Sequence, residues 1–169
     1  SASTVVLEED GLRVTAFTVE HRIGGPAVGY RFDYKGRSVV ISGDTAKSSN
    51  LVRVAQGADL LVHEAMSPRL VQVLKEEALA AGRTNPSKLL QNLQVLHTPP
   101  ADAADVATQA SVHALVLTHL IPPVPGGILE GPFLDGARGR FDGPFSIGED
   151  GDLISLPADG GKSSKRNLL

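Results

Sequence analysis

Residues 38–46 read SVVISGDTA, and this stretch decides the fold expected for the chain. Residues 39–42 suit a buried strand, and after Gly43 the sequence places Asp44 with no other spacer. Because burial of an unpaired carboxylate is costly, an aspartate at this place is normally a turn residue, a helix cap or a metal ligand. The rest of the chain has to distinguish among these three roles.

The composition is that of one globular domain. The chain has 169 residues, of which 41% are hydrophobic and 21% charged, which is enough for a sizeable core. Its formal net charge of -3 gives no electrostatic basis for tight binding of nucleic acid. The absence of cysteine excludes disulfides, thiolate ligands and a cysteine nucleophile, so any metal must be held by histidine and carboxylate. No stretch approaches the roughly 20 apolar residues of a membrane span, and the cellular location stays open.

Strands dominate the beginning of the chain, and strands and helices alternate after Asp44. Runs rich in β-branched residues flank the turns Asp10-Gly11 and Lys35-Gly36, which predicts two hairpins. Ser48 or Ser49 can cap a short helix, and Pro68 opens a longer one that ends before Gly82. The expected strands are residues 4–7, 12–19, 30–34, 37–42, 59–63 and 114–118, and the expected helices are residues 48–55, 68–82 and 100–110.

The last third of the chain is expected to be irregular. Prolines and glycines after Ile121 force turns before short β-like pieces between residues 141 and 156. We therefore assign residues 1–157 to one domain. Residues 158–169, ADGGKSSKRNLL, are expected to form a disordered tail because they offer too little apolar surface to fold.

Four of the five histidines are expected where a strand or strand-like run gives way to a loop. They are His21, His63, His97 and His119, and Asp44 has the same kind of position. One such histidine is normally a turn or core residue, but rigid strands can aim several side chains at one point. Imidazoles with a carboxylate are the ligands expected for zinc or another borderline divalent metal.

Two further polar residues have weaker signals. His113 precedes its strand and is expected to be a surface residue without a role. Glu64 is expected to be solvated, to cap a strand end, or to orient a histidine by hydrogen bonding.

Five stretches, taken in order, resemble the metallo-β-lactamase superfamily, and within it the ribonuclease Z-like branch. They are VEHRIGGPAVGYRF, GRSVVISGDT, DLLVHEA, QVLHTPPADAADVA and ALVLTHL, and together they span most of the chain. The resemblance implies an α/β (α+β) fold, the four-layer αβ/βα sandwich with two metal ions at the edge between its sheets. This chain resembles the second half of that sandwich, as a partial domain.

The resemblance also implies a metal site. His21 and His119 each resemble a histidine that binds one metal, and Asp44 resembles the aspartate that bridges both, so that two cations would neutralise its charge. The implied cofactor is zinc, two ions per complete domain, with manganese or iron as alternatives.

Catalytic roles follow from the same resemblance. His97 and Glu64, in the stretches HTP and HEA, resemble a pair of loops whose histidine protonates the leaving group or stabilises the transition state. His63 would support the HEA loop, and Asp44 would position the metal pair.

The sequence departs from the family pattern in two ways. The H-x-H-x-D-H motif, which supplies four metal ligands, is absent, and three ligands divided between two metals leave both under-coordinated. The chain is therefore expected to be a fragment. In addition, Met66 and residues 121–123 (IPP) replace residues typical of ribonuclease Z, which speaks against tRNA 3′-end processing and favours arylsulfatase-like or lactonase-like relatives.

The expected function is that of a binuclear metal-dependent hydrolase, in which activated water attacks a phosphodiester, a sulfate ester or a lactone. The alternatives are a catalytically incomplete fragment that folds with a partner or a missing half, and a metal-independent binding module. The expected partners are a small-molecule or phosphodiester substrate, with tRNA less favoured, and no membrane. A half domain would expose an apolar sheet face, which predicts a homodimer.

Overall fold

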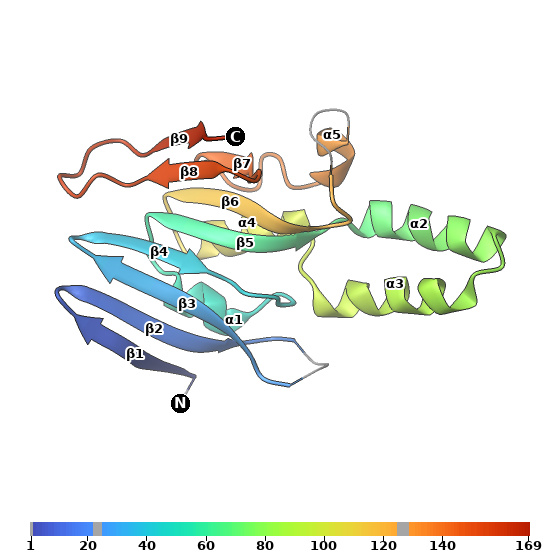
Figure 1. Cartoon of the computed structure of the whole chain (residues 1–169), viewed down its shortest axis with the longest axis horizontal. Coiled ribbons are helices and arrows are strands. Elements are labelled where there is room, and N and C mark those ends of the chain that lie inside the picture. The colour runs from blue at the N-terminus through green and yellow to red at the C-terminus, as the bar shows by residue number, and fades with distance from the viewer. Residues whose placement is uncertain (1, 22–24, 125–128) are drawn as a thin grey trace.

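The computed structural model describes residues 2–21, 25–124 and 129–169 of the chain (Figure 1). Its centre is a seven-stranded sheet in the order β1-β2-β3-β4-β5-β6-β7, beside which β8 and β9 form a two-stranded sheet. The strands are β1 (Ser3–Glu9), β2 (Leu12–Val19), β3 (Ala27–Tyr34), β4 (Arg37–Ile41), β5 (Leu60–Met66), β6 (Ala114–Ile121), β7 (Phe145–Ile147), β8 (Asp152–Ser155) and β9 (Ser164–Asn167). The helices are α1 (Ser49–Val54), α2 (Pro68–Ala80), α3 (Thr84–Leu96), α4 (Pro100–Gln109) and α5 (Glu130–Phe133).

Strand pairing in the sheet changes from antiparallel to parallel at β4. Strands β1 to β4 pair antiparallel, as the two predicted hairpins require, whereas β4, β5, β6 and β7 pair parallel. Parallel neighbours need crossover connections, and here α1 links β4 to β5 while α2, α3 and α4 link β5 to β6. The carboxyl ends of the parallel strands therefore meet at one edge of the sheet.

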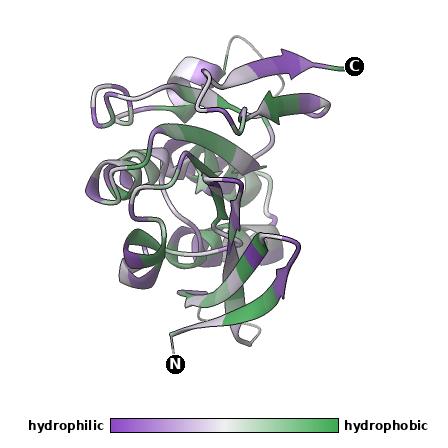
Figure 2. Cartoon of the chain, turned by 90° about the vertical axis from the view of Figure 1, so that its left-hand side faces the viewer, coloured by the Kyte–Doolittle hydropathy of each residue, from purple (hydrophilic) through white to green (hydrophobic). Residues whose placement is uncertain are grey.

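One face of the sheet is covered by α1 and α4. Phe17, Val40, Leu61 and Leu115 point to this face and are buried with the alanines of α4. Ser48 caps α1 by accepting a hydrogen bond from the Leu51 amide, as its position in the sequence predicts. Green, hydrophobic segments run through the strands in Figure 2, with purple, hydrophilic segments among them, in agreement with a sheet that holds the core on one face.

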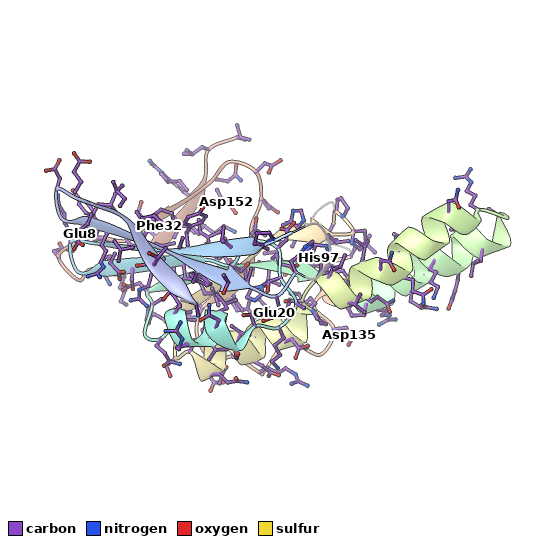
Figure 3. All side chains as sticks on the ribbon, turned by 90° about the horizontal axis from the view of Figure 1, so that it is seen from below. Glu8, Glu20, Phe32, His97, Asp135 and Asp152 are labelled. Atoms are coloured by element: carbon purple, nitrogen blue, oxygen red, sulfur yellow. The ribbon has the colours of Figure 1, made fainter. Side chains whose placement is uncertain are left out.

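The opposite face is covered only in part. Ile154 and Leu156 pack over Leu60, Ala114 and Val116 at the β5–β6 end. Toward β3 the apolar side chains on this face stay open: the exposed fractions of Val28, Tyr30 and Ile41 are 40%, 39% and 40%. Phe32 lies on the same side, away from α1 and α4 (Figure 3).

Two expectations fail outside the sheet. The run before His97 is not a strand end, because it forms α3, which packs against α2 in a hairpin that projects beyond the sheet (Figure 1). The tail expected to be disordered contains β9, which pairs with β8. Composition did not predict β9, because this strand is strongly hydrophilic (Figure 2). It is held by backbone pairing with β8 and by the Lys165–Asp152 ion pair. The hydrogen bond from Arg37 to Gly161 holds the segment before it.

No helix of the described residues is long and apolar enough to cross a membrane.

Candidate active site

The loop after β4 places Asp44 at the carboxyl edge of the sheet. Gly43 makes the turn with a φ of +63°, and a Cβ there would lie 2.4 Å from the carbonyl oxygen of Val28. Only glycine fits both the backbone conformation and the space. The chain therefore leaves the sheet at a fixed angle, and the Asp44 side chain is about half exposed. Asp44 therefore bears no cost of a buried unpaired carboxylate.

Glu64 lies at the centre of the site and ties three segments together. Its Oε1 accepts hydrogen bonds from the backbone amides of Thr45 (3.0 Å) and Thr98 (3.2 Å), and lies 3.1 Å from Nδ1 of His97. Its own amide donates to Oγ of Ser42 at 3.0 Å. The carboxylate is 1% exposed, so these bonds replace its hydration. Among the neighbours that the structure describes, its second oxygen, Oε2, has no hydrogen-bond partner.

His97 directly follows α3 and is 6% exposed. Its Nδ1 is held by Glu64, so Nε2 is the ring nitrogen that remains for a contact outside this pair. The hydrogen bond to Glu64 raises the pKa of His97 above its ordinary value; burial opposes this shift, and the charges of Glu64 and Asp44 support it. A raised pKa favours the protonated ring, which is the form that can donate a proton. Figure 3 shows His97 at the sheet edge from which α2 and α3 project.

His119 is the extra residue of a β-bulge. Glu64 pairs with Thr118 and Ala65 with Leu120, so that His119 has no partner in β5. Its φ of +45° is uncommon for a residue with a side chain, and bulges of this kind re-aim side chains next to functional sites. Its Nε2 lies 3.6 Å from Oδ1 of Asp44, and both side chains are about half exposed.

His21 completes a group of three imidazoles. The rings of His21 and His97 are 5.7 Å apart in an edge-on arrangement, and those of His97 and His119 are 5.8 Å apart. The segment before His21 is joined to the Asp44 loop, because Glu20 pairs with Ala46 and its amide donates to Oγ1 of Thr45. With Glu64, residues from five segments far apart in the sequence thus meet at one edge.

The donor set fits a divalent metal in part. Two atoms bound at about 2.1 Å to one tetrahedral zinc ion are separated by about 3.4 Å, and the Asp44–His119 pair has nearly this spacing. However, no group of three or more histidine, aspartate or glutamate side chains within the described ranges is placed to hold a metal. The pair therefore fits as part of a site that needs further ligands.

His63 and His113 differ in surroundings. His63 was expected at a strand end, but it lies inside β5 and is fully buried. Its Nδ1 lies 2.6 Å from the Glu64 carbonyl oxygen, and its Nε2 has no hydrogen-bond partner among the described residues. Burial lowers the pKa of His63 and keeps the ring neutral. His113 is exposed, as expected.

Two threonines in the site carry bonds that sequence reasoning did not assign. Thr45 and Thr98 are fully buried, and Oγ1 of Thr98 donates to the carbonyl oxygen of Thr45 at 2.5 Å. Together with Glu64 they connect the loop after β4 to the loop before α4. The available signal was that each threonine directly follows a candidate residue, Asp44 or His97.

Comparison with known proteins identifies the family of this chain. The model of the Beta-lactamase superfamily domain matches residues 1–120. Over 153 residues the chain is 34% identical to ribonuclease Z of Mycobacterium avium (strain 104), which corresponds to 90% of this chain and 50% of that protein. It is also 29% identical to ribonuclease Z of Mycobacterium tuberculosis (strain ATCC 25177 / H37Ra), with 85% of this chain and 48% of that protein aligned. The chain spans about half the length of the curated relatives it matches.

Solved structures agree on the fold. The human tRNase Z, short form, is 25% identical with a TM-score of 0.58, over 92% of this chain and 48% of the human protein. The metallo-β-lactamase fold protein YhfI from Bacillus subtilis is 18% identical with a TM-score of 0.59, over 85% of this chain and 49% of that protein. Sequence and fold together confirm the predicted resemblance: the chain belongs to the metallo-β-lactamase superfamily and has part of its mixed α/β fold.

Proposed function

We propose that this chain forms the second half of a metal-dependent hydrolase domain, which includes β9 beyond residue 157 because this strand pairs with β8. The observation that carries the proposal is the meeting of Asp44 and His119, 3.6 Å apart, beside a buried Glu64–His97 pair. The first pair suits a metal and the second suits proton transfer.

In the proposed site, His21, Asp44 and His119 would hold zinc together with donors from outside this chain, with manganese or iron as alternatives. A divalent cation, when bound, lowers the pKa of water and offsets charge on the attacked group. His97 donates a proton from Nε2 to the departing oxygen, while Glu64 fixes the ring through Nδ1. The hydrogen bonds from the Thr45 and Thr98 amides to Glu64 hold the loops of Asp44 and His97 at a fixed distance from each other during this transfer.

The incomplete ligand set supports a role for a complementary half. Such a half would supply the missing donors and cover the open sheet face of Val28, Tyr30 and Ile41. This chain alone would then be inactive, which is what the hypothesis of a catalytically incomplete fragment predicts. A homodimer through the same open face is the second way to cover it.

The relatives named ribonuclease Z suggest a phosphodiester as the first substrate to test. Arylsulfatase-type and lactonase-type esters follow, because Met66 and residues 121–123 depart from the ribonuclease Z pattern.

Metal analysis tests this proposal. We expect about two zinc ions per complete domain and fewer in this chain alone, measured by mass spectrometry after dialysis. Asp44→Ala in the complete domain should lose metal and hydrolysis of bis(4-nitrophenyl) phosphate. Asp142→Ala, which removes an exposed carboxylate elsewhere, is the matched control. Unchanged metal content and turnover in Asp44→Ala would contradict the proposal.

A further inference from the structure

Outside the candidate active site, charged side chains form a network beside the loop that carries Asp44. Nζ of Lys47 lies 2.8 Å from Oδ1 of Asp102 and 3.3 Å from Oδ2 of Asp105. The guanidinium group of Arg140 contacts both oxygens of Asp105, at 3.1 and 3.2 Å. Positive and negative groups thus alternate from Lys47 to Arg140, and charge-assisted hydrogen bonds join them.

The network joins two segments of the site. Lys47 lies three residues after Asp44 and directly precedes Ser48, the N-cap of α1. Asp102 lies in the first turn of α4, which begins three residues after His97. Helices α1 and α4 lie side by side on one face of the sheet (Figure 1). The contact of Lys47 with α4 therefore links the Asp44 loop to the helix that follows His97.

The carboxylates that accept from Lys47 are themselves held in place. Both belong to α4, whose alanines are buried in the core. Arg140 is also fixed, because its Nε donates to the Gly136 carbonyl oxygen at 2.7 Å and its own carbonyl oxygen accepts from Oγ1 of Thr108 at 2.6 Å. Burial alone would raise the pKa of Asp105, but hydrogen bonds from Arg140 and Lys47 hold it below its ordinary value, so this carboxylate stays charged.

The Asp44 loop thus has an inner and an outer link to the rest of the site. The inner link is the buried hydrogen bond from the Thr45 amide to Glu64. The outer link is the contact of Lys47 with α4, and it is open to solvent, since 41% of the Lys47 side chain and 38% of the Asp102 side chain are exposed. Dissolved salt screens exposed ion pairs much more than buried groups. The outer link should therefore weaken as the ionic strength rises.

We infer that Lys47 is a positioning residue of the candidate metal site. It holds the Asp44 loop against α4, limits the motion of that loop, and makes metal binding by the complete domain sensitive to ionic strength. A ligand that is held in place before the metal arrives loses less conformational entropy on binding. The effect on metal rests on the proposed function, whereas the effect on the loop can be measured in this chain without metal.

Backbone amide relaxation measured by NMR, on this chain without metal, tests the effect on the loop. We expect Lys47→Met to increase the motion of the Asp44 and Ala46 amides, and Lys47→Arg, which keeps the charge, to restore the values of the parent. In about 0.5 M salt the parent should approach Lys47→Met. Lys162→Met is the matched control, because it removes an exposed lysine that forms no ion pair within the described ranges.

The zinc affinity of the complete domain, measured by competition with a chelating dye, tests the effect on the site. At low salt Lys47→Met should bind zinc about three- to tenfold more weakly than the parent, and at high salt the difference should fall below about twofold. The double variant Asp102→Asn/Asp105→Asn removes the acceptors and should also bind zinc more weakly. A long-range effect of charge alone would give opposite signs, since loss of a nearby cation favours zinc and loss of carboxylates disfavours it.

These measurements separate the inference from the proposed function. Unchanged relaxation of the Asp44 loop in Lys47→Met overturns the inference, and so does zinc binding by this variant that is as tight as, or tighter than, that of the parent. If the loop becomes more mobile but the parent complete domain binds no zinc, the role of Lys47 in holding the loop stands, and the proposed metal site and hydrolase function fail.

Discussion

The buried and the open parts of the site differ in how complete they are. Glu64, His97, Thr45 and Thr98 are nearly inaccessible and are joined by hydrogen bonds within this chain. Asp44 and His119 are about half exposed; they contact each other at 3.6 Å, and the ring of His119 lies 5.8 Å from that of His97. Under the proposed function, the difference means that this chain organises the proton-transfer part by itself, whereas the metal part would need further ligands. Four variants can break or sharpen this contrast.

Removal of the buried carboxylate should have the largest effect. Glu64→Ala leaves the amides of Thr45 and Thr98 and the ring of His97 without their acceptor, and we expect a loss of about 3–5 kcal/mol in the free energy of unfolding. Urea denaturation measures it. Glu9→Ala, at an exposed site, should stay within about 0.5 kcal/mol of the parent. A Glu64→Ala protein as stable as this control would show that the network does not stabilise the fold.

The sheet was largely predictable from sequence, because its signals are local. Alternating and β-branched runs marked β1 to β6, and Ser48 and Pro68 marked the starts of α1 and α2. Helix α3 was missed because its N-cap, Arg83, makes no side-chain capping bond, and because LQVL also suits a strand. The tertiary contact with α2, which sequence spacing does not reveal, decides in favour of a helix.

The site was predictable as a set of residues but not as a geometry. The resemblance to the family pointed to His21, Asp44, Glu64, His97 and His119, and the structure brings them to one edge. The bulge at His119 could not be foreseen, since it depends on the register between β5 and β6. For the same reason the burial of His63 inside β5 was missed: a strand end cannot be located to within two residues by pattern alone.

Loss of a single hydrogen bond in the buried part should cost less than loss of Glu64. Thr98→Val keeps the shape of the side chain but removes the donor to the Thr45 carbonyl oxygen, with an expected loss of about 1–2 kcal/mol. Thr18→Val, which removes an exposed hydroxyl on β2, is the comparison by urea denaturation. Equal stability of the two variants would mean that the link between the two loops has no energetic weight.

The buried histidine should make stability depend on pH. Burial lowers the pKa of His63 in the folded state, so below its ordinary value of about 6.5 the unfolded chain binds more protons. The stabilisation is therefore present above about pH 6.5 and is lost as the pH falls toward the folded pKa, by at most about 1.4 kcal/mol per pH unit. His63→Leu should flatten this part of the stability profile, measured by urea denaturation between pH 7.5 and 5.5. His113→Leu, at an exposed site, should leave the slope of stability against pH unchanged. An unchanged slope in His63→Leu would mean that other groups cause the pH dependence of stability.

The open part should show the smallest effect on stability. Asp44→Asn removes a charge that is half exposed and forms an ion pair with the equally exposed His119, so the free energy of unfolding of the metal-free protein should change by less than about 0.5 kcal/mol. The same variant should weaken zinc binding in the complete domain, because an amide is a poorer ligand than a carboxylate. Thermal unfolding with and without added zinc separates the two effects: the parent should be stabilised by the metal and the variant much less. Strong destabilisation of the metal-free variant would mean that Asp44 belongs to the self-contained part of the site, and the contrast between the two parts would disappear.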